Sequence, residues 1–242
     1  MEESMREIYK TDSAKIKVDD QTGIFRIEFV HPSPSLIRSL IKTKLIQGAT
    51  STSNYKTIQF KAASVRSLAQ FQSDLKTTTG SPNLPISIAA HLTASLTHQL
   101  KYLVSTESRT IIGYAAEHVI VINDKKFAYL GSEFLSEIEA IDPHTQICYP
   151  FSPTDFFVSP ELLKITDLPS HVHYKTAYFS MACLIISTLL SNTEFYTEYL
   201  RHRQVDKIIT ALHPHPINGT KLYWLLSRCL FDDPERRTIL LI

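Results

Sequence analysis

The sequence predicts an α+β fold in which a small strand-rich N-terminal part precedes a larger, mainly helical C-terminal part. Runs rich in Ile, Val and Phe occupy the first sixty residues, whereas apolar residues at helical spacing dominate from residue 88 onward. The chain has 242 residues, of which 43% are hydrophobic and 20% charged, an ordinary globular composition. A chain of this length accommodates one large domain or two small ones.

The first sixty residues predict strands around one helix. Residues 14–18 and 24–30 are β-branched and aromatic runs joined by a polar turn, which predicts a hairpin. Residues 32–35 supply a stop and an N-cap, and the apolar spacing that follows predicts a helix over 35–47. Residues 55–63 predict a further strand.

The rest of the chain predicts helices interrupted by one hairpin and one long loop. Residues 64–75 and the apolar stripe at 88–103 predict helices, and residues 119–130 predict a hairpin. Residues 132–160 contain four prolines and no strong period, and a loop this long inside a domain is usually functional. Four more helices are expected, the first fully buried: 177–190, 194–203, 205–212 and 221–230.

Charge and glycine content exclude several functions. Lys and Arg number 25 and Asp and Glu 24, a net charge of +1, so no nucleic-acid partner is expected. The six glycines are nowhere closer than Gly113 and Gly131, eighteen positions apart. A glycine-rich phosphate loop needs several glycines within about six to eight positions, so the sequence contains none.

Cysteine use and hydropathy predict the compartment. Three cysteines without C-x-x-C spacing suit a reducing environment. Residues 1–12 contain no apolar run, so no signal peptide is expected. The most apolar segment, 177–190, is too short to cross a bilayer of about 30 Å. We therefore expect an intracellular, cytoplasmic protein with no membrane span.

Three stretches resemble motifs of the protein kinases, in the family's order. Residues 157–162, FVSPEL, resemble the A-P-E motif, often S-P-E, that closes the activation segment. Residues 229–238, CLFDDPERRT, resemble the ending C-L-x-x-D-P-x-x-R-x-S/T, and residues 100–103 resemble the end of the helix before the catalytic loop. The resemblance covers about residues 55–242. It implies a two-lobed kinase-like fold, with a reduced N-lobe over 1–63 and a C-lobe over 64–242.

The resemblance also implies one structural ion pair. In the family the motif glutamate pairs, buried, with the late arginine, which corresponds here to Glu161 and Arg237, with Arg236 as the second choice. Breaking such a pair from one side costs about 3–5 kcal/mol because the remaining charge stays buried. The alternative is two unrelated surface charges, which contribute little.

The catalytic positions of the family are degenerate here. The resemblance places Gly113 at the catalytic base, Ala115 at the catalytic-loop lysine and His118 at the metal-binding asparagine. Tyr129 takes the place of the metal-binding aspartate of D-F-G. Phosphoryl transfer needs a base and hard oxygen ligands for magnesium, which a phenol and an imidazole do not replace.

Two further positions of the family are lost. Glu28 stands where the phosphate-binding lysine belongs, and a one-residue shift offers only Arg26 or Ile27. Ala177 replaces the aspartate that holds the catalytic loop from the buried helix. We therefore expect no catalytic, cofactor-binding or metal-binding residues and no ATP binding.

The sequence offers a few candidate surfaces. The histidine pairs 171/173 and 213/215 lack a nearby cysteine or carboxylate cluster, so solvated loop histidines are the better interpretation. Trp224 lies in a helical stripe and is a candidate interface anchor. The apolar helix at 35–47 is a second candidate patch, because a small N-lobe has little surface to cover it.

The function expected from these observations is that of a non-catalytic pseudokinase. It would act as a scaffold or allosteric subunit of a larger protein assembly. One alternative is an atypical nucleotide-binding or weakly active kinase-like enzyme that uses Glu117, His118 or Tyr129. Another is an unrelated α+β interaction domain, which the lack of a buried helix at 177–190 would favour.

Overall fold

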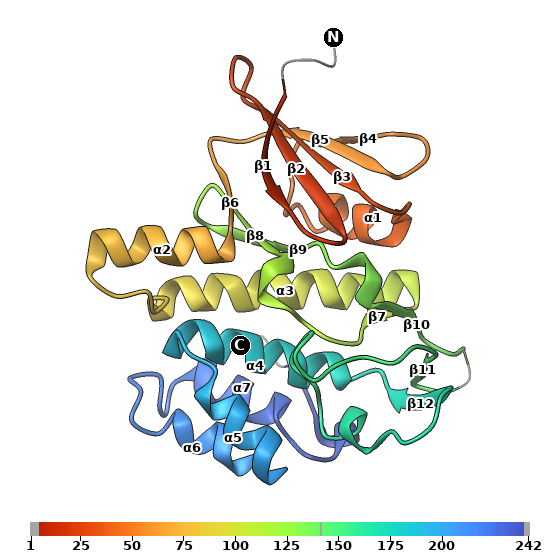
Figure 1. Cartoon of the computed structure of the whole chain (residues 1–242), viewed down its shortest axis with the longest axis vertical. Helices are drawn as coiled ribbons and strands as arrows, with labels where there is room; N and C mark the ends of the chain where they lie inside the picture. Colours follow the sequence, from red (N-terminus) through yellow and green to blue (C-terminus); the bar gives the residue numbers. More distant parts are fainter. Residues whose placement is uncertain (1–4, 141, 240–242) are drawn as a thin grey trace.

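The computed structural model describes residues 5–140 and 142–239 and has an α+β architecture (Figure 1). Its N-terminal sheet is antiparallel, with strand order β1-β2-β3-β5-β4. The helix α1 packs beside this sheet. We call these elements the sheet region; their bounds are β1 (Arg6–Lys10), β2 (Ala14–Asp19), β3 (Ile24–Phe29), α1 (Pro34–Lys42), β4 (Thr50–Ser51) and β5 (Thr57–Lys61).

The alternation of apolar residues sets the register of this sheet. Ile16 pairs with Ile27, and Ile27 pairs with Ile58, so three isoleucines form one fully buried row across the strands. The apolar side of α1, including Leu36 and Leu40, is buried with them. The expected partner patch on this helix is therefore wrong, because the sheet covers the helix.

The hairpin of β8 (Val119–Ile122) and β9 (Lys126–Tyr129) lies between two hydrophobic cores. Because side chains alternate along a strand, Ile120 and Ile122 pack with the sheet region, whereas Val119 and Val121 pack with the helices. The short β6 (Val65–Ser67) pairs with β8. Because residues 65–67 form this strand, the next helix begins at residue 68, whereas the sequence predicts a start at residue 64.

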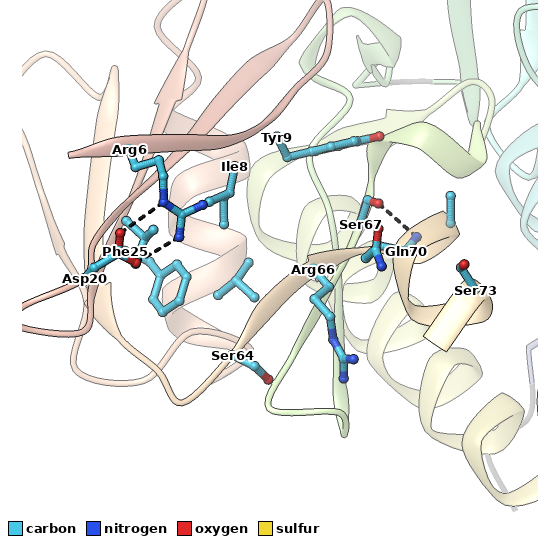
Figure 2. A pocket seen from close by; sticks show the side chains of 13 residues that line it. Arg6, Ile8, Tyr9, Asp20, Phe25, Ser64, Arg66, Ser67, Gln70 and Ser73 are labelled. Atoms are coloured by element: carbon cyan, nitrogen blue, oxygen red, sulfur yellow. Dashed lines mark hydrogen bonds and ion pairs between the residues drawn. The ribbon is translucent and has the colours of Figure 1, made fainter. Parts of the chain in front are cut away.

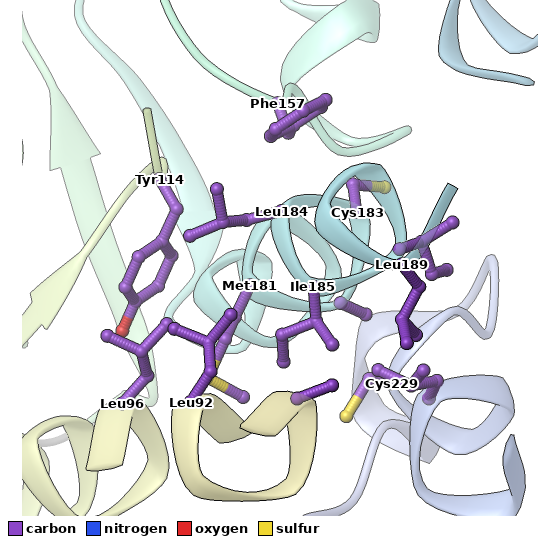
Figure 3. Packing of buried hydrophobic residues seen from close by; sticks show 14 of the residues in the cluster. Leu92, Leu96, Tyr114, Phe157, Met181, Cys183, Leu184, Ile185, Leu189 and Cys229 are labelled. Atoms are coloured by element: carbon purple, nitrogen blue, oxygen red, sulfur yellow. The ribbon is translucent and has the colours of Figure 1, made fainter. Parts of the chain in front are cut away.

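Helices α2 (Leu68–Thr79) and α3 (Ile86–Glu107) follow β6, and α3 crosses the middle of the molecule (Figure 1). Below it lies α4 (Thr176–Leu190), the buried helix that the sequence predicts. Figure 3 shows the side chains of α4 packed between Leu92 of α3 and Cys229 of α7. The remaining helices are α5 (Glu194–His202), α6 (Asp206–Ala211) and α7 (Lys221–Cys229).

Short strands organise the segment that was expected to be irregular. Strand β10 (Leu135–Glu137) pairs with β7 (Arg109–Ile111), and β11 (His144–Ile147) pairs with β12 (Ser170–His173). The sequence did not predict these strands because three or four residues are too few to show a period. Single turns of 3₁₀ helix complete the description: η1 (Ala116–His118), η2 (Ser132–Phe134), η3 (Leu162–Lys164) and η4 (Pro234–Arg236).

No helix within the described residues has the length and apolar character needed to cross a membrane. The three cysteines are free: Cys148 is exposed, and Cys183 and Cys229 are buried. Burial raises the pKa of the Cys229 thiol to about 12, so this side chain packs as a neutral apolar group.

Candidate functional site

Four of the positions that the resemblance marks as degenerate, Gly113, Ala115, His118 and Tyr129, lie close together around the ends of β7 and of the β8–β9 hairpin. Gly113 follows β7, and Tyr129 ends β9. Tyr129 is fully buried, and its hydroxyl donates a hydrogen bond to the Gly113 carbonyl at 2.9 Å. Burial raises the pKa of this phenol well above its usual value, so it stays neutral and acts as a donor. The structure thus brings two of the positions into direct contact.

The backbone of Tyr129 is held by a buried glutamine of α3. The Gln99 amide nitrogen donates to the Tyr129 carbonyl at 2.9 Å, and its amide oxygen accepts from the Tyr129 N–H at 3.0 Å. The same Gln99 nitrogen lies 3.3 Å from the hydroxyl of Ser39 on α1. One side chain therefore joins α1, α3 and β9, and it fixes the position of the phenol.

An aromatic ring fills the space beside Gly113. A Cβ on this glycine would overlap the ring of Phe156, so a side chain there requires the whole ring to move. Phe156 is in turn held between Phe134 and Phe151, with ring centroids at 5.2 and 5.4 Å. Ala115, the next position in question, is buried in the same small cluster. The position that the resemblance assigns to a catalytic base is thus packed against an aromatic ring.

His118 is buried, and its interactions are structural. Its Nε2 lies 2.9 Å from a carboxylate oxygen of Glu133, and its ring packs edge-on against Tyr129 and Phe134. Its Nδ1 has no hydrogen-bond partner within the described residues. The neighbouring Glu117 is exposed, and its carbonyl accepts the hydroxyl of Tyr9 at 2.7 Å. This last bond fastens β1 of the sheet region over the 3₁₀ turn η1.

Ser180, and not Ala177, is the residue of α4 that hydrogen-bonds to the backbone of the segment after β7. Ala177 is fully buried and carries no polar group. One turn further along α4, the hydroxyl of Ser180 accepts the N–H of Tyr114 at 2.6 Å. The segment after β7 therefore remains attached to the buried helix through a neutral hydrogen bond.

Glu28 does not point toward this cluster. It lies on the outer face of β3, where it pairs with Lys17 of β2 at 2.9 Å. Ile27, the position that a one-residue shift of the alignment offers, faces the core together with Phe25 and Phe29. The cation of this strand, Arg26, lies on the same outer face as Glu28, 3.7 Å from its carboxylate, so β3 directs no cation into the core.

Glu161 and Arg237 form a bidentate ion pair. The two guanidinium nitrogens Nη1 and Nη2 donate to the two carboxylate oxygens at 2.6 and 2.7 Å. The Arg237 side chain is 0% exposed, and that of Glu161 is 16% exposed. The guanidinium also donates to three backbone carbonyls, those of Phe231, Asp232 and Lys175.

This ion pair is fully satisfied. Each guanidinium nitrogen has at least one acceptor, and the guanidinium carbon Cζ lies 5.2 Å from the ring centroid of Phe179 on α4. Arg236, the second choice from the sequence, is exposed and stacks on Phe231 instead, at 4.6 Å.

The pocket with the largest volume that we describe lies at the other edge of the sheet region. Figure 2 shows it between β1, β3, β6 and α2. Its volume is about 650 Å³. Its apolar floor includes Phe25 and Val65. Its two cations are already engaged: Arg6 donates to Asp20 at 2.9 and 3.0 Å, and Arg66 pairs with two aspartates. The lining therefore offers no unpaired cation for an anionic ligand.

The described residues contain no group of three or more His, Cys, Asp or Glu side chains arranged to hold a metal ion. The histidine pairs make ordinary contacts. His171 pairs with Glu139 at 2.9 Å, and the ring of His173 packs against His144. Burial lowers the pKa of His173, which favours its neutral form.

No protein-family model matches this chain, and no curated protein matches it. The functional assignment therefore depends on the geometry of the site and on the motifs in the sequence.

Three residues of the site were not anticipated from the sequence: Gln99, Phe156 and Ser180. A signal existed for each. Gln99 and Ser180 are polar residues inside strongly apolar helical stripes, where a polar side chain needs a buried partner. Phe156 belongs to an aromatic group in a segment that otherwise reads as a loop, and such a group predicts a local core.

Proposed function

We propose that this chain is a non-catalytic, kinase-like protein with two lobes that serves as a scaffold or allosteric subunit of a protein assembly. The proposal rests on two facts taken together: the chain has the ion pair that the kinase resemblance implies, and it lacks the catalytic base. The Glu161–Arg237 pair is in place, and the position of the catalytic base, Gly113, is packed against Phe156.

The chemistry of the site supports this proposal. Phosphoryl transfer depends on oxygen ligands that hold magnesium and on a base that orients the acceptor hydroxyl. At the corresponding positions the chain has Tyr129, whose hydroxyl is bonded to a backbone carbonyl, and His118, whose Nε2 is bonded to Glu133. Both side chains are buried and engaged within the protein, so neither is available to a metal–nucleotide complex.

The element order also supports a kinase-like arrangement. A sheet with one helix precedes a helical region built around a buried central helix, and the hairpin β8–β9 lies between the two cores. Tyr9 and Ser13 of the sheet region bond to the backbone of Glu117 and Ser132 across this junction, at 2.7 and 3.0 Å. These bonds hold the two parts closed over the cluster.

A phosphoryl-transfer assay tests the proposal directly. The pure chain is incubated with γ-labelled ATP, magnesium or manganese, and casein or myelin basic protein as the acceptor. We expect no transfer above that of a heat-denatured control. Robust transfer that the Tyr129→Phe variant reduces would overturn the proposal, because it would place chemistry at the buried cluster.

A second candidate, nucleotide binding without catalysis, rests on the volume of the pocket beside β6 alone, about 650 Å³, since both of its arginines are already paired with aspartates. Thermal unfolding with and without Mg-ATP separates it from the first. A ligand present at 100 times its Kd adds about 2.7 kcal/mol, which is roughly 5–10 °C in Tm for a chain of this size. We expect no shift, and a shift that Val65→Arg removes would support the second candidate.

A further inference from the structure

One face of α7 carries the chain's single tryptophan between two cations. Trp224 is 55% exposed, whereas Leu226 and Cys229 on the opposite side of the helix are buried against α4 (Figure 3). At 3.6 residues per turn, Lys221 and Arg228 lie within about 60° of Trp224 around the helix axis. The three side chains therefore share the outward side of α7, which we call the α7 face.

The cations of the α7 face have no acidic partner in the described part of the chain. Within residues 5–140 and 142–239, neither Lys221 nor Arg228 forms an ion pair with a carboxylate. The sequence gives the reason: it contains no Asp or Glu between Asp206 and Asp232, although 24 of its 242 residues are acidic. The helix itself therefore supplies no carboxylate to these cations, and the first acidic residues beyond it are Asp232 and Asp233.

The aromatic and cationic character continues past the end of α7. Phe231 follows the helix after one residue and is partly buried, and the guanidinium of Arg236 stacks over its ring at 4.6 Å. Exposed aromatic rings beside cations are the composition found at the energetic centres of protein interfaces, where Trp and Arg are enriched. An exposed tryptophan by itself does not indicate what kind of partner binds. The two cations beside it, which have no acidic partner among the described residues, indicate a partner with negative charge.

We propose that the α7 face binds an acidic segment of a partner protein, with an apolar side chain of that segment on the Trp224 indole and its carboxylates at Lys221 and Arg228. The inference rests on the proposed role as a binding subunit and names the chemistry of its partner. Nucleic acid is the less favoured occupant, because two cations on a chain of net charge +1 do not supply the extended positive surface that a phosphate backbone requires.

Peptide selection tests the proposal with the full chain. A display library of random 12-residue peptides is selected on the purified protein, with counter-selection on Trp224→Ala. The selected peptides are synthesised together with copies in which Asn and Gln replace Asp and Glu. Binding is followed by the anisotropy of labelled peptide and by the emission of Trp224, which reports this face alone because the chain has no other tryptophan.

Matched variants test whether binding depends on the α7 face or on any exposed aromatic or charged residue. Trp224→Ala and Lys221→Glu/Arg228→Glu change the face. Tyr149→Ala removes a more exposed aromatic ring elsewhere, and Lys101→Glu reverses an exposed charge on α3. Unchanged melting temperatures show that each variant is folded, as expected for side chains that point to solvent.

The proposal expects selected peptides rich in Asp and Glu around Leu or Phe. Trp224→Ala weakens their binding about tenfold or more, the charge reversal weakens it similarly, and both controls bind as the native chain does. Binding also weakens as salt rises, because exposed charges are screened.

Three results would overturn the proposal: no peptide is selected, the amide copies bind as tightly as the acidic ones, or single-stranded DNA shifts the Trp224 emission when acidic peptides do not. Phosphoryl transfer by the same protein would instead contradict the proposed function and leave the peptide result standing, so the two failures are distinguishable.

Discussion

Two buried centres of this molecule differ in how they satisfy their polar groups. At the Glu161–Arg237 pair, a full charge is buried with five hydrogen bonds, two to the carboxylate and three to backbone carbonyls. Around Tyr129, no formal charge is buried with the phenol; a neutral hydroxyl and a glutamine amide satisfy the backbone. The first centre is stabilised by an ion pair, whereas the second consists of neutral hydrogen bonds surrounded by aromatic rings.

The difference follows from what each centre must hold in place. The guanidinium of Arg237 joins Glu161, in the segment after β11, to the backbone just before η4 and to the residue that precedes α4. A neutral residue has too few donors to do this, since arginine alone presents five N–H groups in a planar fork. The Tyr129 centre has only one loop carbonyl to satisfy, and a single hydroxyl is enough.

The largest effect is expected from breaking the ion pair. Arg237→Ala leaves Glu161 and three carbonyls without their donor in a dry site, so we expect a loss of about 3–5 kcal/mol in the free energy of unfolding. For a chain of this size that is a fall of roughly 6–20 °C in Tm. Urea and thermal unfolding of the purified variant measure it.

The adjacent arginine is a matched control for this prediction. Arg236→Ala removes an exposed guanidinium that stacks on Phe231, so its effect should stay below about 1 kcal/mol. Equal losses for the two variants would show that the ion pair has no special weight in this fold.

A smaller effect is expected from placing a side chain at Gly113. Gly113→Ala forces the Phe156 ring out of its site, and overpacking of this kind costs about 1–3 kcal/mol. If the ring is the cause, Phe156→Ala should relieve the strain. The double variant should then lose at least about 1 kcal/mol less than the sum of the single variants. Additive losses would contradict the filled position described above.

The sequence was most informative where periodicity is long. The stripes at 88–103 and 177–190 predicted α3 and α4 to within a few residues, because many apolar positions repeat at one spacing. The sequence did not predict strand β1, because Arg6–Lys10 is mostly charged and shows no apolar run. Its extended conformation depends on pairing with β2.

The candidate site was predictable only in part. The motifs placed Glu161 near Arg237, and the structure brings them together. No sequence pattern shows that Phe156 fills the space beside Gly113, because the two positions are 43 residues apart (156 − 113) and meet only through tertiary packing. Glu28 illustrates the opposite problem: an alignment shift of one residue moves a side chain to the other face of a strand.

Tyr129 and Tyr114 allow the contribution of a single buried hydroxyl to be compared. Tyr129→Phe removes the donor to the Gly113 carbonyl, and a buried unsatisfied carbonyl costs about 1–2 kcal/mol. The ring of Tyr114 lies 4.7 Å from that of Tyr129, yet its buried hydroxyl has no partner in the described part of the chain. Tyr114→Phe should therefore be neutral or slightly stabilising. Chemical denaturation of the two variants distinguishes them, and the reverse order would contradict the assigned hydrogen bond.

The smallest effect concerns a second arginine fork, which differs from Arg237 mainly in exposure. Arg38 of α1 donates to both carboxylate oxygens of Glu107 on α3, at 2.8 and 2.5 Å, but its side chain is 39% exposed. The Arg38 guanidinium holds the pKa of Glu107 below its ordinary value near 4.5, and the hydroxyl of Tyr102 assists. Solvent screening should limit the contribution of this pair to about 1 kcal/mol.

The lowered pKa gives that prediction a pH dependence with a definite sign. The Glu107 carboxylate binds its proton less readily in the folded protein than in the unfolded chain, so the stabilisation is fully present above pH 4.5 and disappears as pH falls through the lower, folded pKa. Glu107→Gln should be less stable than the native chain by a constant amount at pH 6–7, and the gap should narrow as pH falls below 4.5. Urea unfolding at pH 7, 5, 4 and 3 measures the difference, and a gap that does not narrow between pH 5 and pH 3 would mean that glutamine disturbs packing rather than charge.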